Sequence, residues 1–260
     1  MAETIAVLSL KGGTGKTTTV RTLTDVLRRI GLDVLAIDLD PQGNLSDYFD
    51  VAPDASPTIA DVLTGDAKAK AAVHDGIVPA SPILAEVERA LSGKIGRELV
   101  LRKALKDVRK SHDIILVDCQ PALGLLTING LVAADWALIS SEAQYFALQG
   151  VEGALEVIEQ AREFYNPDLV WLGVLLNIAD MRTVHSRQAY AQLKEHFPDK
   201  VFETVIRSSI AYAESAEKGI SILDHRPDLG VDYLALADEV LRRVGLKDAR
   251  KKLKPLLAAA

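Results

Sequence analysis

A glycine-rich stretch constrains the fold of this chain more than any other feature. It runs from Lys11 to Thr18, reads K-G-G-T-G-K-T-T, and fits the phosphate-loop pattern G-x-x-x-x-G-K-[ST] only in part. A short apolar run with β-branched residues, Ile5 to Ser9, precedes it, and Thr17 to Ile30 carries apolar residues at helical spacing. The sequence therefore predicts a buried strand, a glycine-rich turn and an amphipathic helix in direct succession.

The same stretch has the chemistry of an anion site, which favours this reading over an ordinary tight turn. Glycines let the backbone approach a phosphate and adopt positive φ, and free N–H groups at a helix start attract negative charge. The Lys16 ammonium would neutralise β- and γ-phosphate charge, and the Thr17 hydroxyl would ligate Mg²⁺. The residues expected to bind nucleotide here are Lys11, Gly12, Gly13, Thr14, Gly15, Lys16, Thr17 and Thr18.

Acidic residues follow two further apolar runs. Val34 to Ile37 leads to Asp38 and Asp40, and a second hydrophobic run ends at Asp118. In open α/β sheets, ligands bind at the carboxyl ends of the strands, so these carboxylates are expected near the glycine-rich loop. Asp118 could hold the water shell of Mg²⁺. For Asp40, a helix N-cap before Pro41 is the alternative.

The glycine-rich stretch resembles the deviant Walker A motif, K-G-G-x-G-K-[ST], of the ParA/MinD family of P-loop ATPases. The resemblance runs from about Ile5 to about Val244 and is nearest to the Soj/ParA branch, through D-L-D-P-Q-G-N at 38–44 and A-L-Q-G at 147–150. It implies an α/β P-loop NTPase fold, a mostly parallel twisted sheet with helices on both faces. It also implies ATP and Mg²⁺ as cofactors and a homodimer in which Lys11 reaches the partner subunit's phosphates.

The resemblance also implies roles for single residues. Asp40 would position the attacking water and contact the Mg²⁺ shell, with Lys11 and Lys16 as the charge clamp. Asn177 would recognise adenine, although a turn residue at a strand end is the alternative, and Arg207 would line the nucleotide. Two segments depart from the family: D-x-P-P-S reads D-C-Q-P-A at 118–122, and V-I-P-R-N-x-R reads V-I-R-S-S-I-A at 205–211.

Composition limits the remaining possibilities. The net charge is −6 and the pI is near 5.4, which argues against a generally basic surface but allows a local basic patch. The single cysteine, Cys119, cannot form an intramolecular disulfide or a Cys-based metal site, which suits the cytosol. No apolar run approaches the length of a transmembrane helix. We expect one P-loop ATPase domain over residues 1–246 and a basic, disordered or frayed tail over 247–260.

Two basic regions interrupt this acidic chain. The run between Arg97 and Lys110 also contains Glu98 and Asp107, so a solvated helix face is favoured over a binding site. Near the C-terminus, the residues predicted to contact DNA are Arg242, Arg243, Lys247, Arg250, Lys251, Lys252 and Lys254. Binding to an anionic membrane and a frayed, solvated end are the alternatives for this tail. Pro255 is expected to break a long helix there, which makes membrane binding the least favoured.

These observations lead to one functional hypothesis and two alternatives. The hypothesis is a ParA/Soj-like ATPase that dimerises with ATP and Mg²⁺, binds DNA nonspecifically and responds to a ParB-like or other stimulating partner protein. It would segregate a plasmid or chromosome, or position cargo, in the cytoplasm at the nucleoid. The alternatives are a MinD-like membrane-associated positioning ATPase and a metabolic ATP-dependent synthetase on the same scaffold.

Overall fold

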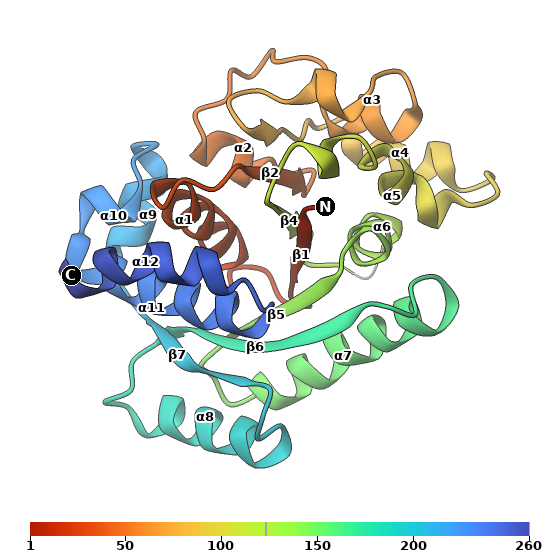
Figure 1. The fold of residues 1–260 in the computed structure, drawn as a ribbon. Helices are drawn as coiled ribbons and strands as arrows, with labels where there is room; N and C mark the ends of the chain where they lie inside the picture. The colour runs from red at the N-terminus through yellow and green to blue at the C-terminus, as the bar shows by residue number, and fades with distance from the viewer. Residues whose placement is uncertain (123, 260) are drawn as a thin grey trace.

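A parallel sheet organises the chain. Over residues 1–122 and 124–259, which the computed structural model describes, the strands are β1 Glu3–Leu8, β2 Val34–Leu39, β3 Ile77–Val78, β4 Ile114–Cys119, β5 Trp136–Glu142, β6 Val170–Ala179 and β7 Val201–Arg207. Their order is β3-β2-β4-β1-β5-β6-β7, and every neighbouring pair is parallel (Figure 1). The predicted α/β fold with a parallel sheet is therefore confirmed.

Helices connect the strands and cover both faces of the sheet (Figure 1). The α-helices are α1 Lys16–Arg29, α2 Asn44–Tyr48, α3 Ile59–Thr64, α4 Leu84–Leu91, α5 Val100–Ala104, α6 Leu125–Ala133, α7 Ala147–Phe164, α8 Val184–His196, α9 Ala211–Glu217, α10 Ile222–His225, α11 Pro227–Arg243 and α12 Lys247–Ala259. Short 3₁₀ helices lie at Ala69–Ala72, Arg97–Leu99 and Val108–Lys110. No helix in the described ranges has the length and apolar character needed to cross a membrane.

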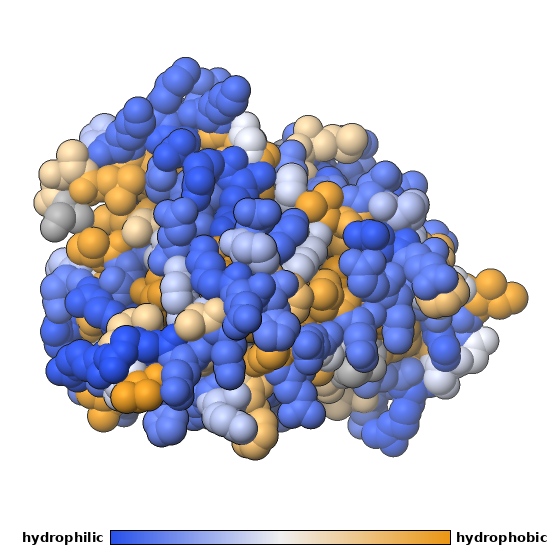
Figure 2. Space-filling model, turned by 90° about the horizontal axis from the view of Figure 1, so that it is seen from below, coloured by the Kyte–Doolittle hydropathy of each residue, from blue (hydrophilic) through white to orange (hydrophobic). Residues whose placement is uncertain are grey.

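The alternation of side chains along each strand explains the two helical layers. On β1, Ile5 and Val7 face one apolar cluster, while Ala6 and Leu8 face the other. The first cluster includes residues of α1, α2 and α9 to α12, and the second includes residues of α3 to α8. Because both faces are buried, the strands read as nearly continuous apolar runs. The outer side over α7 and α8 carries mostly hydrophilic side chains (Figure 2).

The C-terminal segment is a packed helix where we expected a frayed tail. Helix α12 contacts α11, and it buries Leu253 completely and Ala249 almost completely. Pro255 lies inside the helix, so the expectation that it ends the helix was wrong. Leu256 and Leu257, which follow it, are partly buried against the same cluster. This apolar packing outweighs the backbone hydrogen bond that proline cannot donate. Residue 260 lies outside the described residues.

A buried carboxylate fastens the edge strand β7 to α11. Glu239 accepts N–H bonds from Glu203 at 3.1 Å and Thr204 at 3.1 Å, and Arg243 pairs with it at 2.8 Å. Burial alone would raise the pKa of Glu239, but the bonds from Arg243 and the two amides hold that pKa below its usual value. The carboxylate is therefore an ionised anchor near neutral pH.

We expect Glu239→Ala to lower the free energy of unfolding by about 3 kcal/mol, because it leaves two amides unpaired and a largely buried guanidinium without its carboxylate counter-charge. Urea unfolding at pH 7 measures this. The difference from the parent should shrink as the pH falls through the lowered pKa of Glu239, where the parent carboxylate also loses its charge. Glu217→Ala, at the exposed end of α9, is the matched control and should cost less than about 0.5 kcal/mol. A loss below about 1 kcal/mol for Glu239→Ala would contradict the anchor.

Candidate functional site

The glycine-rich loop between β1 and α1 needs glycine where it enters the helix. Gly15 caps α1 with φ of 80°, in the left-handed region that disfavours other residues. A Cβ placed on Gly15 would also lie 3.1–3.3 Å from the side-chain amide of Asn177. Both the backbone angle and the close approach of β6 therefore require this glycine.

A hydrogen-bond network from the sheet holds the loop from below. The Ser140 hydroxyl donates to the Thr14 carbonyl at 2.7 Å, and the Thr19 hydroxyl donates to the Gly15 carbonyl at 2.8 Å. The Asn177 amide nitrogen donates to both hydroxyl oxygens, at 2.8 and 3.2 Å. The carbonyls of Thr14 and Gly15 thus accept hydrogen bonds from hydroxyl groups beneath the loop.

The groups left free at this loop are donors and a cation. Within the part of the chain that the structure describes, the N–H groups of residues 12–15 have no hydrogen-bond partner. Lys16 is only 6 % exposed, and no carboxylate of a described residue lies within ion-pair distance of it. The Lys16 charge therefore faces the site without a counter-charge, and such a largely buried cation favours an anion nearby. The loop is therefore built to receive an anion.

Two carboxylates lie beside the loop at the ends of neighbouring strands. Asp38 on β2 and Asp118 on β4 are register partners, and both are buried. The Thr17 hydroxyl donates to one Asp118 oxygen at 2.7 Å, while the other oxygen is buried without a partner among the described residues. Burial raises the pKa of Asp118, and the charge of Asp38 raises it further; burial also raises the pKa of Asp38. The pair favours a nearby cation.

Asp38 also fixes the loop that carries Asp40. One Asp38 oxygen accepts the Asp40 N–H at 3.1 Å, and the other accepts the N–H and hydroxyl of Ser46 at 2.9 and 2.8 Å. Asp40 itself accepts the Gln42 N–H at 3.0 Å. Sequence reasoning placed the chemistry on Asp40 and gave Asp38 no role. The sequence does carry a signal for this role of Asp38: it is the first acid of the D-x-D pattern and lies inside the apolar strand, where a carboxylate needs hydrogen-bond donors.

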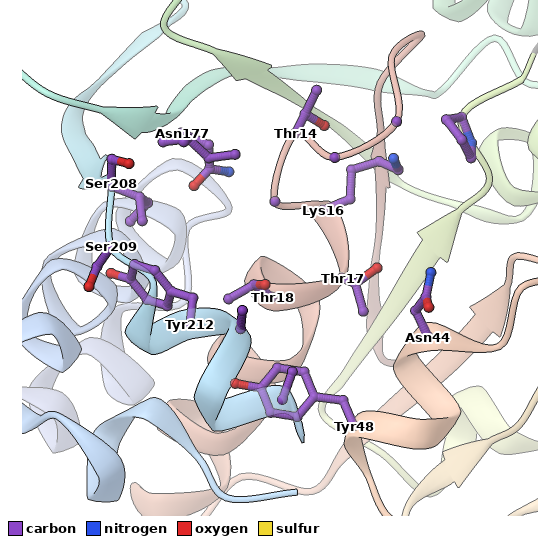
Figure 3. A pocket seen from close by; sticks show the side chains of 18 of the residues that line it. Thr14, Lys16, Thr17, Thr18, Asn44, Tyr48, Asn177, Ser208, Ser209 and Tyr212 are labelled. Atoms are coloured by element: carbon purple, nitrogen blue, oxygen red, sulfur yellow. The ribbon is translucent and has the colours of Figure 1, made fainter. Parts of the chain in front are cut away.

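A cavity of about 700 Å³ opens over the loop (Figure 3). The residues that line it are Gly12, Gly13, Thr14, Gly15, Lys16, Thr17, Thr18, Asp40, Gln42, Asn44, Asp47, Tyr48, Pro121, Asn177, Ile178, Ile206, Arg207, Ser208, Ser209, Tyr212, Ala213, Ala216 and Tyr233. The loop and Asp40 thus face one chamber. This volume suits a ligand of nucleotide size.

Of the end of the cavity away from the loop, only Arg207 was predicted. Ser208, Ser209 and Tyr212 follow β7, and Tyr48 reaches in from α2 (Figure 3). The Tyr48 hydroxyl bonds to Ser215 of α9, whereas the buried Tyr212 hydroxyl has no partner in the described ranges. Burial raises the pKa of Tyr212, so its hydroxyl stays a neutral donor. No local pattern in the sequence marks these tyrosines.

Three residues predicted to contact nucleotide make contacts within the protein in this structure. Asn177 lies inside β6, where its amide supports the loop. Arg207 lines the cavity, but its guanidinium pairs with Asp232 at 2.9 Å. Lys11 is not among the cavity-lining residues; its ammonium pairs with Glu142 of its own chain at 2.6 Å.

The altered segment at 118–122 keeps a defined shape. The Thr127 hydroxyl of α6 donates to the Ala122 carbonyl at 2.6 Å, and Pro121 lines the cavity. The segment therefore remains fastened to the start of α6 although it lacks the second proline and the serine of the family pattern. Cys119 is a free, buried thiol whose pKa is raised by burial, as expected for an inert residue.

Most of the guanidinium groups predicted to contact DNA are committed within the fold. Arg243 is largely buried, and it donates to carbonyls of Leu172 and Val201 at 3.0 Å besides pairing with Glu239. Arg250 pairs with Asp238 at 2.6 Å. Of the others, Arg242 lies 3.6 Å from Glu239, and Lys251 pairs with Asp248 at 2.9 Å. Lys247, Lys252 and Lys254 are exposed.

Comparisons with known proteins agree with this geometry. A family profile described as an AAA domain matches residues 2–171. The sporulation initiation inhibitor protein Soj of Bacillus subtilis (strain 168) is 38 % identical over 249 residues, covering 92 % of this chain and 98 % of that protein. The chromosome-partitioning ATPase Soj of Thermus thermophilus is 40 % identical over 248 residues, covering 92 % and 96 %. The chain belongs to the ParA/MinD family of P-loop ATPases, in its Soj/ParA branch.

Solved structures of this fold include nucleotide complexes. Cobyrinic acid a,c-diamide synthase of Mycobacterium smegmatis with ADP and magnesium has a TM-score of 0.76 and 33 % identity, covering 86 % of this chain and 95 % of that one. The Cyanothece McdA(D38A)–ATP complex has a TM-score of 0.82 and 26 % identity, covering 94 % and 96 %. MinD of Pyrococcus horikoshii with Mg-ADP has a TM-score of 0.78 and 27 % identity, covering 95 % and 99 %.

The network below the loop predicts the effect of Asn177→Ala. Loss of its two hydrogen bonds should loosen the loop and raise the Kd for ATP about tenfold, which corresponds to about 1.4 kcal/mol. If the network acts by holding a phosphate-binding loop, the Kd for GTP should rise by the same factor as the Kd for ATP; titration with fluorescent nucleotides measures both. Ser92→Ala, an exposed serine outside the cavity, is the control. A loss confined to ATP would show instead that Asn177 recognises adenine.

Proposed function

We propose that this protein is a ParA-like partition ATPase, which uses ATP and Mg²⁺ to control its assembly on DNA. The observation that carries the proposal is Lys16, a largely buried side chain that lines the cavity and has no carboxylate partner in the described ranges, set in a loop of unpaired N–H groups. A triphosphate satisfies both. The amides would cradle the phosphates, and Lys16 would neutralise their charge.

The residues present fit a magnesium ion. No three His, Cys, Asp or Glu side chains converge into a metal-binding group anywhere in the described ranges. Mg²⁺ in nucleotide sites does not need such a cage, because it takes one or two carboxylates together with phosphates and waters. The Thr17 hydroxyl and the unpartnered Asp118 oxygen would hold the ion, with Asp40 at its water shell. Bound there, it would supply positive charge for the developing charge on the phosphates.

Hydrolysis would then rest on positions that the fold already fixes. Asp40 faces the cavity on a loop held by Asp38, so it can orient a water without a large rearrangement. Lys16 and the loop amides stabilise charge on the transferred phosphate. Binding and water positioning are therefore tasks of different residues.

This separation gives opposite expectations for two variants. Lys16→Ala should weaken ATP binding by at least about 100-fold, or about 2.7 kcal/mol, because the phosphates lose their buried counter-charge. Asp40→Ala should bind ATP normally, lose at least about 100-fold in hydrolysis and accumulate as a dimer. Size-exclusion chromatography with ATP and a phosphate-release assay measure these effects. An Asp40→Ala protein that binds ATP but stays monomeric would refute the assignment of Asp40.

A homodimer follows from the family's use of Lys11. In the single chain described here, the Lys11 ammonium bonds to Glu142 and to Gln144 at 2.9 Å, on an exposed surface outside the cavity. From there it would move to the phosphates of the partner subunit. Exposed ion pairs contribute little to stability, about 0–1 kcal/mol, so the contact with Glu142 is easily exchanged.

We expect Lys11→Ala to bind ATP as a monomer within about threefold of the parent affinity but to form no ATP-dependent dimer, since the missing charge serves the other subunit. Light scattering with and without ATP checks this. Lys70→Ala removes an equally exposed lysine and should dimerise like the parent. ATP-dependent dimers of Lys11→Ala would exclude a role in the partner's site.

The partner and location follow from the partition proposal. We infer that the ATP dimer binds DNA without sequence preference, that a ParB-like protein stimulates hydrolysis, and that the protein acts at the nucleoid. Relatives named as partition proteins cover nearly the whole chain and support this. A MinD-like membrane anchor is disfavoured, because the apolar side of α12 packs on α11 through Leu253.

The metabolic alternative has one supporting observation, the likeness to cobyrinic acid a,c-diamide synthase. The two functions differ in what ATP hydrolysis requires, since an amide-forming enzyme consumes ATP only in the presence of an acid substrate and a nitrogen donor. ATP turnover stimulated by glutamine and a corrinoid acid would favour the synthetase. Turnover stimulated by DNA and a ParB-like protein would favour partition, which the curated relatives at 38–40 % identity support more directly.

A further inference from the structure

The segment from residue 89 to residue 110 carries a local excess of positive charge. Its eight lysines and arginines exceed its two acids, Glu98 and Asp107, by six charges, in a chain whose total is −6. In the sequence the two acids interrupt the run, which favours a solvated face. In the structure their positions change that conclusion.

Both acids form ion pairs with basic residues of the same run. Arg97 pairs with Glu98 at 2.9 Å and Lys110 pairs with Asp107 at 3.1 Å. Arg109 turns inward to Asp135 at 2.6 Å. Five exposed cations remain, and no carboxylate of a described residue lies within ion-pair distance of any of them: Arg89, Lys94, Arg102, Lys103 and Lys106. We call these five residues the α4–α5 cationic surface.

Packing turns three of these cations outward together. Leu101 and Leu105 are fully buried, so Arg102 and Lys103 on α5, and Lys106 just after it, lie on the exposed side of this segment. The turn between α4 and α5 contains Gly96 with φ of 73°. A Cβ on Gly96 would lie 3.9 Å from the Lys103 ammonium. In Figure 1, α4, α5 and this loop project on the side away from α10, α11 and α12.

The C-terminal cations form a weaker site, because carboxylates lie close to most of them. Arg243, Arg250 and Lys251 are neutralised by carboxylates within the fold. Lys247 and Lys252 share a cleft with the acidic residues Glu3, Asp113 and Asp248. Because nearby carboxylates reduce the field that a polyanion meets, the residues first expected to contact DNA are poorly placed for it.

We propose that the α4–α5 cationic surface contacts the phosphate backbone of DNA, an inference that rests on the proposed partition function. Three of its five cations are lysines, which act as flexible point charges on phosphate. No aromatic residue occurs between residues 89 and 110 to stack on a base. This chemistry gives affinity without reading sequence, and a strong salt dependence, because each neutralised phosphate contributes about −0.9 to the log–log slope.

The test compares two triple variants with the same change of charge. One, called the α5 variant, is Arg102→Gln and Lys103→Gln on α5 together with Lys106→Gln just after it; the control is Lys247→Gln, Lys252→Gln, Lys254→Gln on α12. Both sets are exposed, and none of these residues belongs to the nucleotide site. Binding of a mixed-sequence duplex is measured with ATP at several salt concentrations. ATP affinity and the melting temperature confirm that each variant is folded.

We expect the α5 variant to lose at least about tenfold in DNA affinity and to reduce the salt slope by about 2 to 3, since up to three phosphate contacts disappear. The α12 control should lose less than about threefold, because its lysines lie among carboxylates. Full DNA binding by the α5 variant, or equal losses by both, would overturn this surface while leaving the partition function intact.

Two further results distinguish a failure of this surface from a failure of the proposed partition function. If the unaltered protein dimerises with ATP but binds no DNA at low salt, the DNA-binding part of the proposed function fails, and this surface with it. The protein could instead bind vesicles with 30 % phosphatidylglycerol and no DNA. If the α5 variant then fails to bind these vesicles, the surface serves a membrane and the proposal is wrong.

Discussion

Two buried carboxylates, side by side at the ends of β2 and β4, set the conditions for the whole edge of the sheet. Asp38 and Asp118 would repel each other if both were ionised, and burial raises the pKa of each. Like charges in such a place require compensation. Hydrogen bonds to Ser46 and the Asp40 amide compensate Asp38, whereas Asp118 has only the Thr17 hydroxyl. Because one Asp118 oxygen has no partner among the described residues, the site favours a cation there. A bound cation would in turn attract phosphates.

The sheet order explains why these requirements meet in one cavity. β1 lies at the centre, between β4 and β5, and its loop therefore receives Asp118 from one neighbour and Ser140 from the other. β6 adds Asn177 from one strand further. Ligand sites of parallel sheets form at such a reversal of strand order. The anion loop, the carboxylates and the supporting hydroxyls thus come from segments far apart in the chain but from adjacent strand ends.

Local patterns were enough to predict part of this structure. The strand, glycine turn and helix of the loop and the acid near the end of β4 are all encoded by neighbouring residues. Contacts between distant segments were not predictable. Nothing near Arg243 in the sequence shows that its guanidinium would meet the carbonyls of Leu172 and Val201. Likewise, Pro255 suggested a helix end because the packing of α12 on α11 is a tertiary effect.

The burial of Leu253 also affects how this protein should be manipulated. Residues Lys247–Ala259 form a helix that covers part of the apolar face of α11. A truncation at Gly245 would remove the basic charges and uncover that face in the same step, so reduced stability or aggregation would be mistaken for a lost contact. An affinity tag or a fluorescent fusion placed after the last helical turn leaves this packing intact, whereas one that replaces the helix does not.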